Sequence, residues 1–547
     1  MPERRNMMKS LTEKIWKYIG GVNGLLLVLY LIFAFTSAVI TNKHLSRYYF
    51  AGSLLIIVVL TVVVSPIVMR LFSKASIKPR KKNGEIRFST KALLFTVFFF
   101  VSFICFLLYF IAFYPGGYYP DSFSQYHQAM NSEYNDWHPV MHTLVAFKLP
   151  LAITDGWVGS IVLFQIICFS LVLAYSFTVI YNYTGWTYTV LSMIYILGNP
   201  QTGNIAMFPF KDVSFAIGAL LLLTYALQIY VTKGEWVRKP INMAFFVVAE
   251  VLTTLFRHNA VLFTVPLIAA VLFFMTWKRG LALCIAVLML YTGVKGPFYN
   301  SIGVVRPGER IVEMLGLPMT VIGAAATYTE DRLDDETREF ALKVAPREVW
   351  EEKFMPGCYN WVKWDSRTNN GVIEAYGARR VVSMMLRCFR DSGVVSVVSL
   401  IRLTEAAYTF SNSYGKDFSL VMEPGVLDNN ENIAMMGNKT MATLIRGFNH
   451  AVSDLLPHVF LYLGVMHFIL ILAILSKNRL NRLNDLKKIF FVLPVFAYNY
   501  GTTLLLTGMN DAPRFFFYTF MLMPCLLIIL LQEENEERTE RQLPEGI

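Results

Sequence analysis

The sequence predicts an all-α polytopic membrane protein, a bundle of about twelve transmembrane helices with a mostly helical extracytoplasmic domain. Three observations predict this class. The chain has 547 residues, of which 55% are hydrophobic and only 16% are charged, which is far from the balance of a soluble globular domain. Apolar runs recur along it, each about 17 to 24 residues long, the length that crosses a bilayer as a helix. Basic residues gather in the short segments between these runs.

The apolar runs define the membrane part in chain order. They start near residues 21, 49, 92, 157, 187, 213, 241, 259, 280, 454, 488 and 513, and the runs at 187, 241 and 280 are the weakest. The first run, residues 21–40, is long enough to span and is followed by no small-residue cleavage pattern. It therefore predicts a retained helix and not a cleaved signal peptide.

Basic clusters between the runs predict the orientation, because cytoplasmic loops of membrane proteins carry an excess of Lys and Arg. Five clusters occur, in residues 4–17, 70–87, 233–239, 278–279 and 477–488. Twelve spans place all five on the cytoplasmic side, whereas a miscount of one helix would move the later clusters outside. The sequence thus predicts a multi-pass protein of the cell membrane with both termini in the cytoplasm.

This topology divides the chain into four parts. Residues 1–295 form an N-terminal transmembrane module of about nine helices, with a first outer loop at 114–156. Residues 296–450 form the extracytoplasmic domain, residues 451–532 the C-terminal transmembrane helices, and residues 533–547 an acidic cytoplasmic tail. The formal charge of +11 does not indicate nucleic acid, because the cations form no patch on a soluble fold. The lipid bilayer is the partner that the composition implies.

The six cysteines show no spacing typical of a zinc ribbon or a disulfide framework. Cys358 and Cys388 both fall in the long polar segment. If that segment is exported, they could form one disulfide; two buried thiols are the alternative.

Polar residues of the first outer loop include a candidate general base. Asp121 follows Pro120, and a carboxylate at the mouth of a membrane cavity can take a proton from an acceptor hydroxyl. The alternative is a helix start, because Asp and Ser after Pro, with Gln125 three residues beyond Ser122, fit N-terminal capping. The further candidates on this stretch are Gln125, Tyr126 and His127.

His138 and His142 are four residues apart and flank Pro139, which can start a helix, so they could share one helical face with Asp136 nearby. Two histidines and a carboxylate could hold a divalent metal ion. The alternative is that they form hydrogen bonds to backbone or lipid headgroups at the membrane interface. No other cofactor is indicated.

Charged residues also occur at three helix ends on the predicted outer face. They are Lys211-Asp212, Arg257-His258-Asn259 and Asn510-Asp511-Ala512-Pro513-Arg514. Ionisable residues at such a depth are costly and usually face a cavity or pair with one another. The alternative is that Lys211 and Arg514 snorkel to the interface with local carboxylates as partners. Cations gathered near one carboxylate suit a reaction on a phosphorylated lipid, since Arg and Lys hold a phosphate and stabilise its charge as it leaves.

With these motifs the sequence resembles the GT-C superfamily of membrane glycosyltransferases, and within it an uncharacterised bacterial branch. The features that match are Pro120-Asp121-Ser122, Trp137-His138-Pro139, Phe210-Lys211-Asp212, Phe256-Arg257-His258-Asn259, Ala512-Pro513-Arg514-Phe515 and the stretch 313–319. The resemblance covers most of the chain in topology, but its motifs are short. It implies a GT-C-like bundle that uses a polyprenyl-phosphate-linked sugar outside the cytoplasm.

The resemblance also implies roles for particular residues. Asp121 matches the acidic residue of the first outer loop that acts as catalytic base in the superfamily, and His138 would position the acceptor or this base. The contacts to the donor phosphate would be Lys211, Arg257 and Arg514. Many relatives carry two adjacent acidic residues in that loop, whereas Ser122 follows Asp121 here, which leaves metal dependence open.

The function expected from the resemblance is transfer of a sugar from a polyprenyl-phosphate donor to a cell-surface glycan, polymer or lipid acceptor. A transporter or flippase for a lipid-linked or anionic substrate is the alternative from another class, with the same cations as its binding site. A transporter would carry polar residues near the bilayer midplane. A glycan polymerase or ligase differs mainly in its acceptor.

Overall fold

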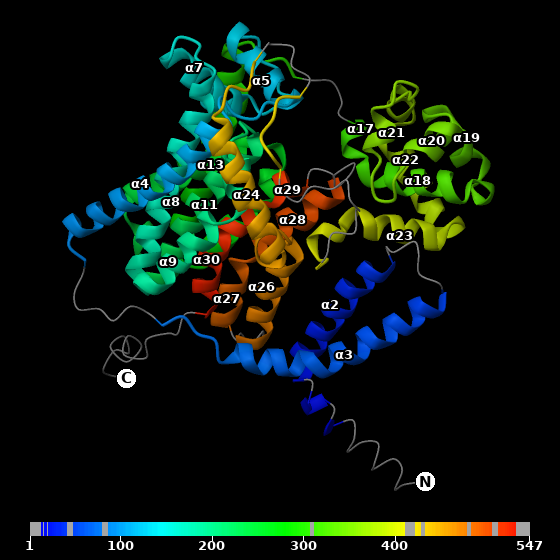
Figure 1. The fold of residues 1–547 in the computed structure, drawn as a ribbon, viewed down its shortest axis with the longest axis horizontal. Helices are drawn as coiled ribbons and strands as arrows, with labels where there is room; N and C mark the ends of the chain where they lie inside the picture. The colour runs from blue at the N-terminus through cyan, green and yellow to red at the C-terminus, as the bar shows by residue number, and fades with distance from the viewer. Residues whose placement is uncertain are drawn as a thin grey trace.

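The computed structural model describes residues 13–14, 16–18, 20–40, 47–78, 86–306, 311–410, 422–427, 433–477, 483–505 and 512–531. Within these ranges all regular structure is helical, and β-type pairing is limited to isolated bridges such as that between Tyr118 and Val426. The predicted all-α class is confirmed. Figure 1 shows the main bundle, with a smaller helical unit and the pair α2 and α3 beside it.

Each of the twelve predicted apolar runs contains one main helix. These are α2 (Gly21–Ile40), α3 (Arg47–Ser73), α4 (Phe88–Ala112), α8 (Gly159–Thr184), α9 (Trp186–Leu197), α11 (Lys211–Val231), α13 (Pro240–Phe256), α14 (Val261–Leu272), α15 (Trp277–Gly293), α26 (Leu463–Lys477), α28 (Leu493–Leu505) and α30 (Tyr518–Leu531).

Six helical segments of the described chain are long and apolar enough to cross a membrane. They are Ala51–Ser73, Phe88–Ala112, Gly159–Thr184, Lys211–Val231, Trp277–Ser301 and Arg514–Leu531. Further apolar helices of the described chain are shorter. For example, α9 stops before Pro200, which opens a separate short helix, α10 (Pro200–Ile205). The number of membrane crossings therefore stays a prediction.

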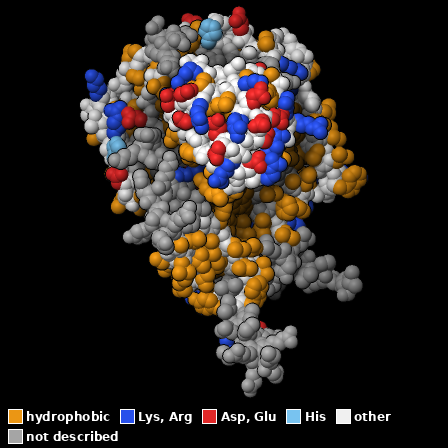
Figure 2. Space-filling model, turned by 90° about the vertical axis from the view of Figure 1, so that its right-hand side faces the viewer, with side chains coloured by type: hydrophobic (Ala, Val, Ile, Leu, Met, Phe, Trp, Pro, Cys, Tyr) orange, Lys and Arg blue, Asp and Glu red, His pale blue; other side chains and the backbone are white. Residues whose placement is uncertain are grey.

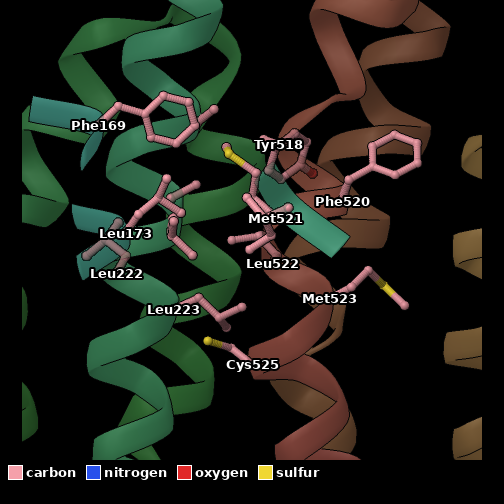
Figure 3. Close-up of a cluster of buried hydrophobic side chains, with 14 of the residues drawn as sticks. Phe169, Leu173, Leu222, Leu223, Tyr518, Phe520, Met521, Leu522, Met523 and Cys525 are labelled. Carbon is pink, nitrogen blue, oxygen red and sulfur yellow. The ribbon is translucent and has the colours of Figure 1, made fainter. Parts of the chain in front are cut away.

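The core of the bundle lies between α8, α11 and α30. Figure 3 shows Phe169 and Leu173 of α8, Leu222 and Leu223 of α11, and Leu522 of α30 meeting in one cluster. Nearly every side chain of α30 is buried, so this last helix is surrounded by the others. In a bilayer the lipid is as apolar as these side chains, and such a core holds helices together mainly through close packing.

Apolar side chains also cover much of the outside. Large exposed hydrophobic residues line α2, α3 and α15, among them Leu29, Phe33, Leu55, Ile56, Leu60, Leu71, Leu281, Leu288 and Met289. Figure 2 shows a hydrophobic region below a part of the surface that is rich in charged side chains. Apolar patches of this size mark a surface that contacts lipid or another apolar partner. Together with the six long apolar helices they support a membrane protein.

Residues 311–410 fold as a smaller helical unit. Its helices are α17 (Ile311–Met314), α18 (Gly316–Tyr328), α19 (Asp335–Val344), α20 (Arg347–Lys353), α21 (Asn360–Lys363), α22 (Gly371–Asp391) and α23 (Gly393–Thr404). It has its own core around Met319, Phe340 and Trp350, and α18 and α23 contact α28 of the bundle. Cys358 and Cys388 are buried thiols and form no disulfide. The thiol alternative is therefore the one found.

The surface of this unit is strongly polar. Arg387 pairs with Asp334 at 3.1 Å and with Glu336 at 2.7 Å, and Arg390 pairs with Asp391 at 2.7 Å. Figure 2 faces this side of the molecule and shows Lys, Arg, Asp and Glu crowded together above the hydrophobic region. The unit is thus built for an aqueous surface beside the apolar bundle.

The first outer loop folds into short helices: α5 (Pro120–Asn131), α6 (Val140–His142), the π-helix η1 (Thr143–Lys148) and α7 (Leu149–Ile153). Two stretches that are distant in the sequence, residues 422–427 and 433–438, contact this loop. The amide of Tyr118 donates to the carbonyl of Gly425, and the amide of Met436 donates to the carbonyl of Tyr114, both at 2.9 Å. After the second stretch, α24 (Lys439–Leu455) packs against α4. Residues 433–455 therefore lie on the bundle and not in the core of the smaller unit.

Several helix ends that lie away from the first outer loop contact one another. The Ile77 amide after α3 donates to the carbonyl of Leu531 at the end of α30 at 3.1 Å, and Asn23 at the start of α2 donates to the carbonyl of Leu475 near the end of α26 at 3.1 Å. The rings of Tyr230 and Phe274 both contact Phe491, which joins the ends of α11 and α14 to the start of α28. The predicted cytoplasmic basic segments follow or precede these ends.

Candidate functional site

The predicted charged residues come together where the first outer loop meets the beginnings of α11 and α29 (Ala512–Phe516). Arg514 donates from Nη2 to Oδ2 of Asp121 at 2.7 Å, and Nζ of Lys211 lies 3.4 Å from the same oxygen. On its other side, Nε of Arg514 lies 3.1 Å from Oδ2 of Asp212, whose other oxygen pairs with Arg257. We call these five residues the charged cluster.

Helix ends position each member of the cluster. Pro120 occupies the first position of α5, which places Asp121 in the first turn, as Pro favours this position. Lys211 and Asp212 open α11 after the extended residue Phe210. Arg257 is itself extended, with φ −152° and ψ 133°, and separates α13 from the 3-10 helix η2 (His258–Ala260). Carboxylates near the N-termini of α5 and α11 also interact favourably with the helix dipoles.

Burial decreases in order across the cluster. The exposed fractions of the side chains are 0% for Asp212, 6% for Arg257, 10% for Arg514, 19% for Lys211 and 33% for Asp121. The pair of Asp212 and Arg257 therefore forms a buried base that holds Arg514. Asp121 and Lys211 are the members that an incoming molecule can reach.

The cluster carries an excess of positive charge inside an aromatic wall. Three cations face two carboxylates, which leaves one positive charge. The guanidinium of Arg514 lies 4.6 Å from the ring centre of Phe210 and 5.0 Å from that of Phe515, and the guanidinium of Arg257 lies 4.8 Å from that of Phe515. Aromatic faces stabilise cations where water is scarce. The arrangement suits an anion that brings its own negative charge.

Asp121 is ionised within this cluster. Burial alone would raise its pKa, but the charges of Lys211 and Arg514 and the hydrogen bond from Arg514 hold the pKa well below its ordinary value. His138 also belongs here, because its Nδ1 lies 3.1 Å from Nζ of Lys211. Burial and the neighbouring charge of Lys211 lower the pKa of His138 from 6.5 to about 3, so this histidine is neutral near pH 7.

The structure places the other predicted residues elsewhere. Nδ1 of His142 contacts Oε1 of Gln125 at 2.6 Å, Asp136 pairs with Lys295 at 2.7 Å, and His127 contacts Asn131 on the exposed side of α5. His258 is exposed beside Arg257, and Tyr126 packs against a small hydrophobic cluster around Tyr118. Asp511 lies outside the described residues.

The structure does not bring Asp136, His138 and His142 together as one group. Each of the three has a different partner, namely Lys295, Lys211 and Gln125. Among the residues that the structure describes, no three His, Cys, Asp or Glu side chains come close enough to hold a metal ion. Both histidines contact side chains of the protein, whereas the alternative interpretation expected contacts with backbone or lipid headgroups.

Arg257 is supported by Asn259, which belongs to the predicted motif, and by Tyr498 and Thr502, which sequence reasoning missed. Its Nε donates to Oδ1 of Asn259 at 2.6 Å, and Nδ2 of Asn259 donates to Thr502 at 2.9 Å. The guanidinium lies 5.6 Å from the ring centre of Tyr498. Tyr498 and Thr502 are four residues apart and share one face of α28. This spacing of polar groups in a largely apolar run could have indicated that the two residues face the site.

Sequence reasoning also missed a buried carboxyl group inside an apolar helix. Glu250 lies within α13 and is 1% exposed. Within the described chain, neither of its carboxylate oxygens makes a hydrogen bond of normal geometry. Glu250 is the single charged residue in the apolar run that starts near residue 241. This isolated charge could have indicated a buried carboxyl group.

Compared with known proteins, the chain matches no protein-family model, no curated protein and no solved structure. The residues of the charged cluster and their geometry therefore carry the functional argument.

Proposed function

We propose that this protein is a membrane glycosyltransferase that moves a sugar from a polyprenyl-phosphate donor to a cell-surface glycan, polymer or lipid acceptor. The observation that carries the proposal is the charged cluster: one accessible carboxylate, Asp121, beside three cations with a surplus positive charge. A base and an anion-binding group side by side are what transfer from a phosphate leaving group requires.

The reaction follows from these positions. Asp121 takes the proton of an acceptor hydroxyl, and the oxygen of that hydroxyl forms a bond to the anomeric carbon of the donor sugar. The bond between that carbon and the phosphate oxygen breaks, and the lipid phosphate leaves with the electron pair. Lys211 and Arg514 stabilise the charge on the phosphate through charge-assisted hydrogen bonds. Arg257 contributes indirectly, because it pairs with Asp212, which in turn holds Arg514.

Donor binding also activates the base. Asp121 is held by Arg514 and Lys211, which makes it a weak base. The donor phosphodiester, which carries one negative charge, competes for the same two cations. Asp121 then loses its partners, and its pKa rises toward the ordinary value. The carboxylate becomes an effective base only when the donor is present.

The remaining architecture supports this role. The site lies at the ends of helices, and the predicted cytoplasmic basic segments lie near the opposite ends. We infer twelve spans with both termini in the cytoplasm and the site outside. The apolar outer faces of the bundle suit the polyprenyl chain, and the polar unit of residues 311–410 suits selection of the acceptor.

The test is to incubate the purified protein in detergent with a panel of radiolabelled polyprenyl-phosphate sugars and to follow release of the lipid phosphate. Asp121→Asn should reduce the rate by about a hundredfold to ten-thousandfold, the usual contribution of a general base, with lipid binding retained. Asp391→Asn, in a pair on the smaller unit, is the matched control and should behave as wild type. Unchanged turnover of Asp121→Asn would remove the base assignment.

A transporter or flippase is the second candidate, and Glu250 is the observation that favours it. Carboxyl groups buried among apolar helices occur in proton relays and transport pathways. Glu250→Gln should leave release of lipid phosphate at the wild-type rate if the protein is a glycosyltransferase. The rival is supported instead if wild type releases no phosphate from any donor and moves a fluorescent lipid phosphate across liposomes, with Glu250→Gln abolishing that movement.

A glycan polymerase or ligase uses the same cluster with a lipid-linked acceptor. Supplying such an acceptor in the release assay and sizing the product separates this alternative. A product still attached to the acceptor lipid would identify it.

A further inference from the structure

The contact between Lys211 and His138 determines which nitrogen of the imidazole carries the proton. Nζ of Lys211 lies 3.1 Å from Nδ1 of His138. An ammonium group has only donors, so Nδ1 must accept and cannot carry a proton. The carboxylate of Asp121, 3.4 Å from Nζ of Lys211, favours the charged form of this lysine. The neutral ring therefore carries its proton on Nε2.

The surroundings of the ring agree with this tautomer. His138 is 4% exposed, and its neighbours Lys211 and Arg514 are both cations, which disfavour a charged imidazolium. Only Asp121 acts in the opposite direction. Burial next to two cations leaves the neutral form as the stable one.

The Nε2 group is free to contact another molecule. Within the described residues, Nε2 of His138 makes no hydrogen bond and is not among the fully buried polar atoms. His142 differs in this respect, because its Nδ1 is taken by Gln125 and its Nε2 is completely buried. Of the two histidines, His138 alone presents a donor beside Asp121 and Lys211.

We propose that His138 binds the substrate as a hydrogen-bond donor, with its Nε2–H directed to a phosphate oxygen of the donor lipid, and that it does not accept a proton during the reaction. The proposal rests on the proposed function for the identity of the ligand. A neutral donor adds a hydrogen bond to the phosphate without adding charge to a cluster that already has one cation in excess. Lys211 thus binds phosphate and also fixes the tautomer of its neighbour.

The tautomer itself is tested without any enzymatic activity. The full-length protein is labelled with 15N-histidine, reconstituted in liposomes and compared with His138→Gln by solid-state NMR. The difference spectrum should show an unprotonated Nδ1 and a protonated Nε2 at neutral pH. A doubly protonated ring, or a proton on Nδ1, would overturn the proposal.

The role of Nε2–H is tested by binding of a polyprenyl phosphate that carries no sugar. The amide of Gln reaches the place of Nε2, whereas the amide of Asn reaches only the place of Nδ1. His138→Gln should therefore bind within about threefold of wild type, and His138→Asn and His138→Ala should bind about tenfold more weakly or worse, as expected for a lost hydrogen bond to a charged group. His127→Gln, on the exposed side of α5, is the control.

The outcomes separate this inference from the proposed function. Equal binding by all variants, or better retention by Asn than by Gln, overturns the role of His138 even if sugar transfer occurs. The expected order of binding with no release from any donor sugar keeps His138 as a phosphate contact and removes the glycosyltransferase. Thermal unfolding of each variant in detergent shows whether a loss of binding comes from misfolding, in which case the NMR result decides.

Discussion

At the scale of single residues, the buried base of the charged cluster determines where its reactive members lie. Asp212 is completely buried and contacts both Arg257 and Arg514. Arg514 in turn holds Asp121. The buried carboxylate of Asp212 thus positions the accessible carboxylate of Asp121 through Arg514. Removing one partner of a buried ion pair leaves the others uncompensated, which is costly.

Asp212→Ala should lower the free energy of unfolding by about 3 to 5 kcal/mol, because two guanidinium groups lose a buried partner. Chemical unfolding in detergent, followed by tryptophan fluorescence, measures the change. Glu339→Ala removes the partner of Lys343 in a pair whose side chains are 62% and 51% exposed, and it should cost less than about 1 kcal/mol. Equal effects of the two substitutions would contradict the buried base.

The pKa of His138 predicts how stability depends on pH. The folded protein keeps this ring neutral down to about pH 3, whereas the unfolded chain takes up the proton near 6.5. The unfolded state therefore binds more protons between these values, and stability falls as the pH is lowered through this window. Asp121 adds a loss in the same direction, confined to pH values below its ordinary pKa of 3.8.

The measurement is the thermal unfolding midpoint in detergent from neutral pH down to about pH 4. The midpoint of His138→Gln should fall less steeply with acid than that of wild type. His127→Gln replaces an exposed histidine and should leave the wild-type slope unchanged. The same slope in wild type and His138→Gln would show that the ring titrates normally.

At the scale of elements, interruptions of helices build the site. The extended conformation at Arg257 ends α13 and turns its guanidinium toward α11 and α28. The segment of residues 433–438 crosses the end of α4, and the Asn438 amide donates to the carbonyl of Ile111 at 2.8 Å. At this crossing Gly437 approaches the backbone of Ala112 so closely that a Cβ atom would overlap it. A residue without a side chain is required there.

Gly437→Ala should therefore lower the free energy of unfolding by about 1 to 3 kcal/mol, the usual cost of forcing an atom into a packed site. Because the segment pairs with the first outer loop, hydrogen exchange should also increase at Tyr118 and Met436. Gly393→Ala, where an added Cβ meets nothing within 4 Å, is the control and should be neutral. A stable Gly437→Ala variant with unchanged exchange would show that the crossing is not tightly packed.

At the scale of the whole molecule, a polar unit stands beside an apolar bundle that carries charge at opposite ends. The exposed apolar residues of α2, α3 and α15 separate the charged cluster from the basic segments. Bilayer thickness requires such an apolar band, because charged groups within it are costly. The arrangement gives the proposed topology a direct test.

In intact cells, a cysteine at the exposed Glu348 of the smaller unit should react with a membrane-impermeant maleimide. A cysteine at the exposed Lys278 should react only after the membrane is permeabilised. The background for both is a variant in which the six native cysteines, all partly or fully buried, are replaced by alanine. The reverse pattern of labelling would invert the topology and place the charged cluster in the cytoplasm.

The sequence by itself determined the all-α class, the positions of the twelve apolar runs that contain the main helices, and the residues that carry charge at helix ends. These features depend on local patterns, since apolar runs and Lys or Arg clusters are read from neighbouring residues. Asp121, Lys211 and Arg514 were predicted as candidates for this reason, and they do meet.

Only the tertiary structure decided which charged residues and histidines contact one another. Asp121 and Arg514 are 393 residues apart, and no local pattern shows that one arginine joins Asp121 to Asp212. The tertiary structure likewise showed that His138 contacts Lys211 and His142 contacts Gln125, so that two histidines four residues apart have separate partners. Helical spacing places side chains on one face, but the ion pairs depend on which helix ends pack together, and long-range packing decides that.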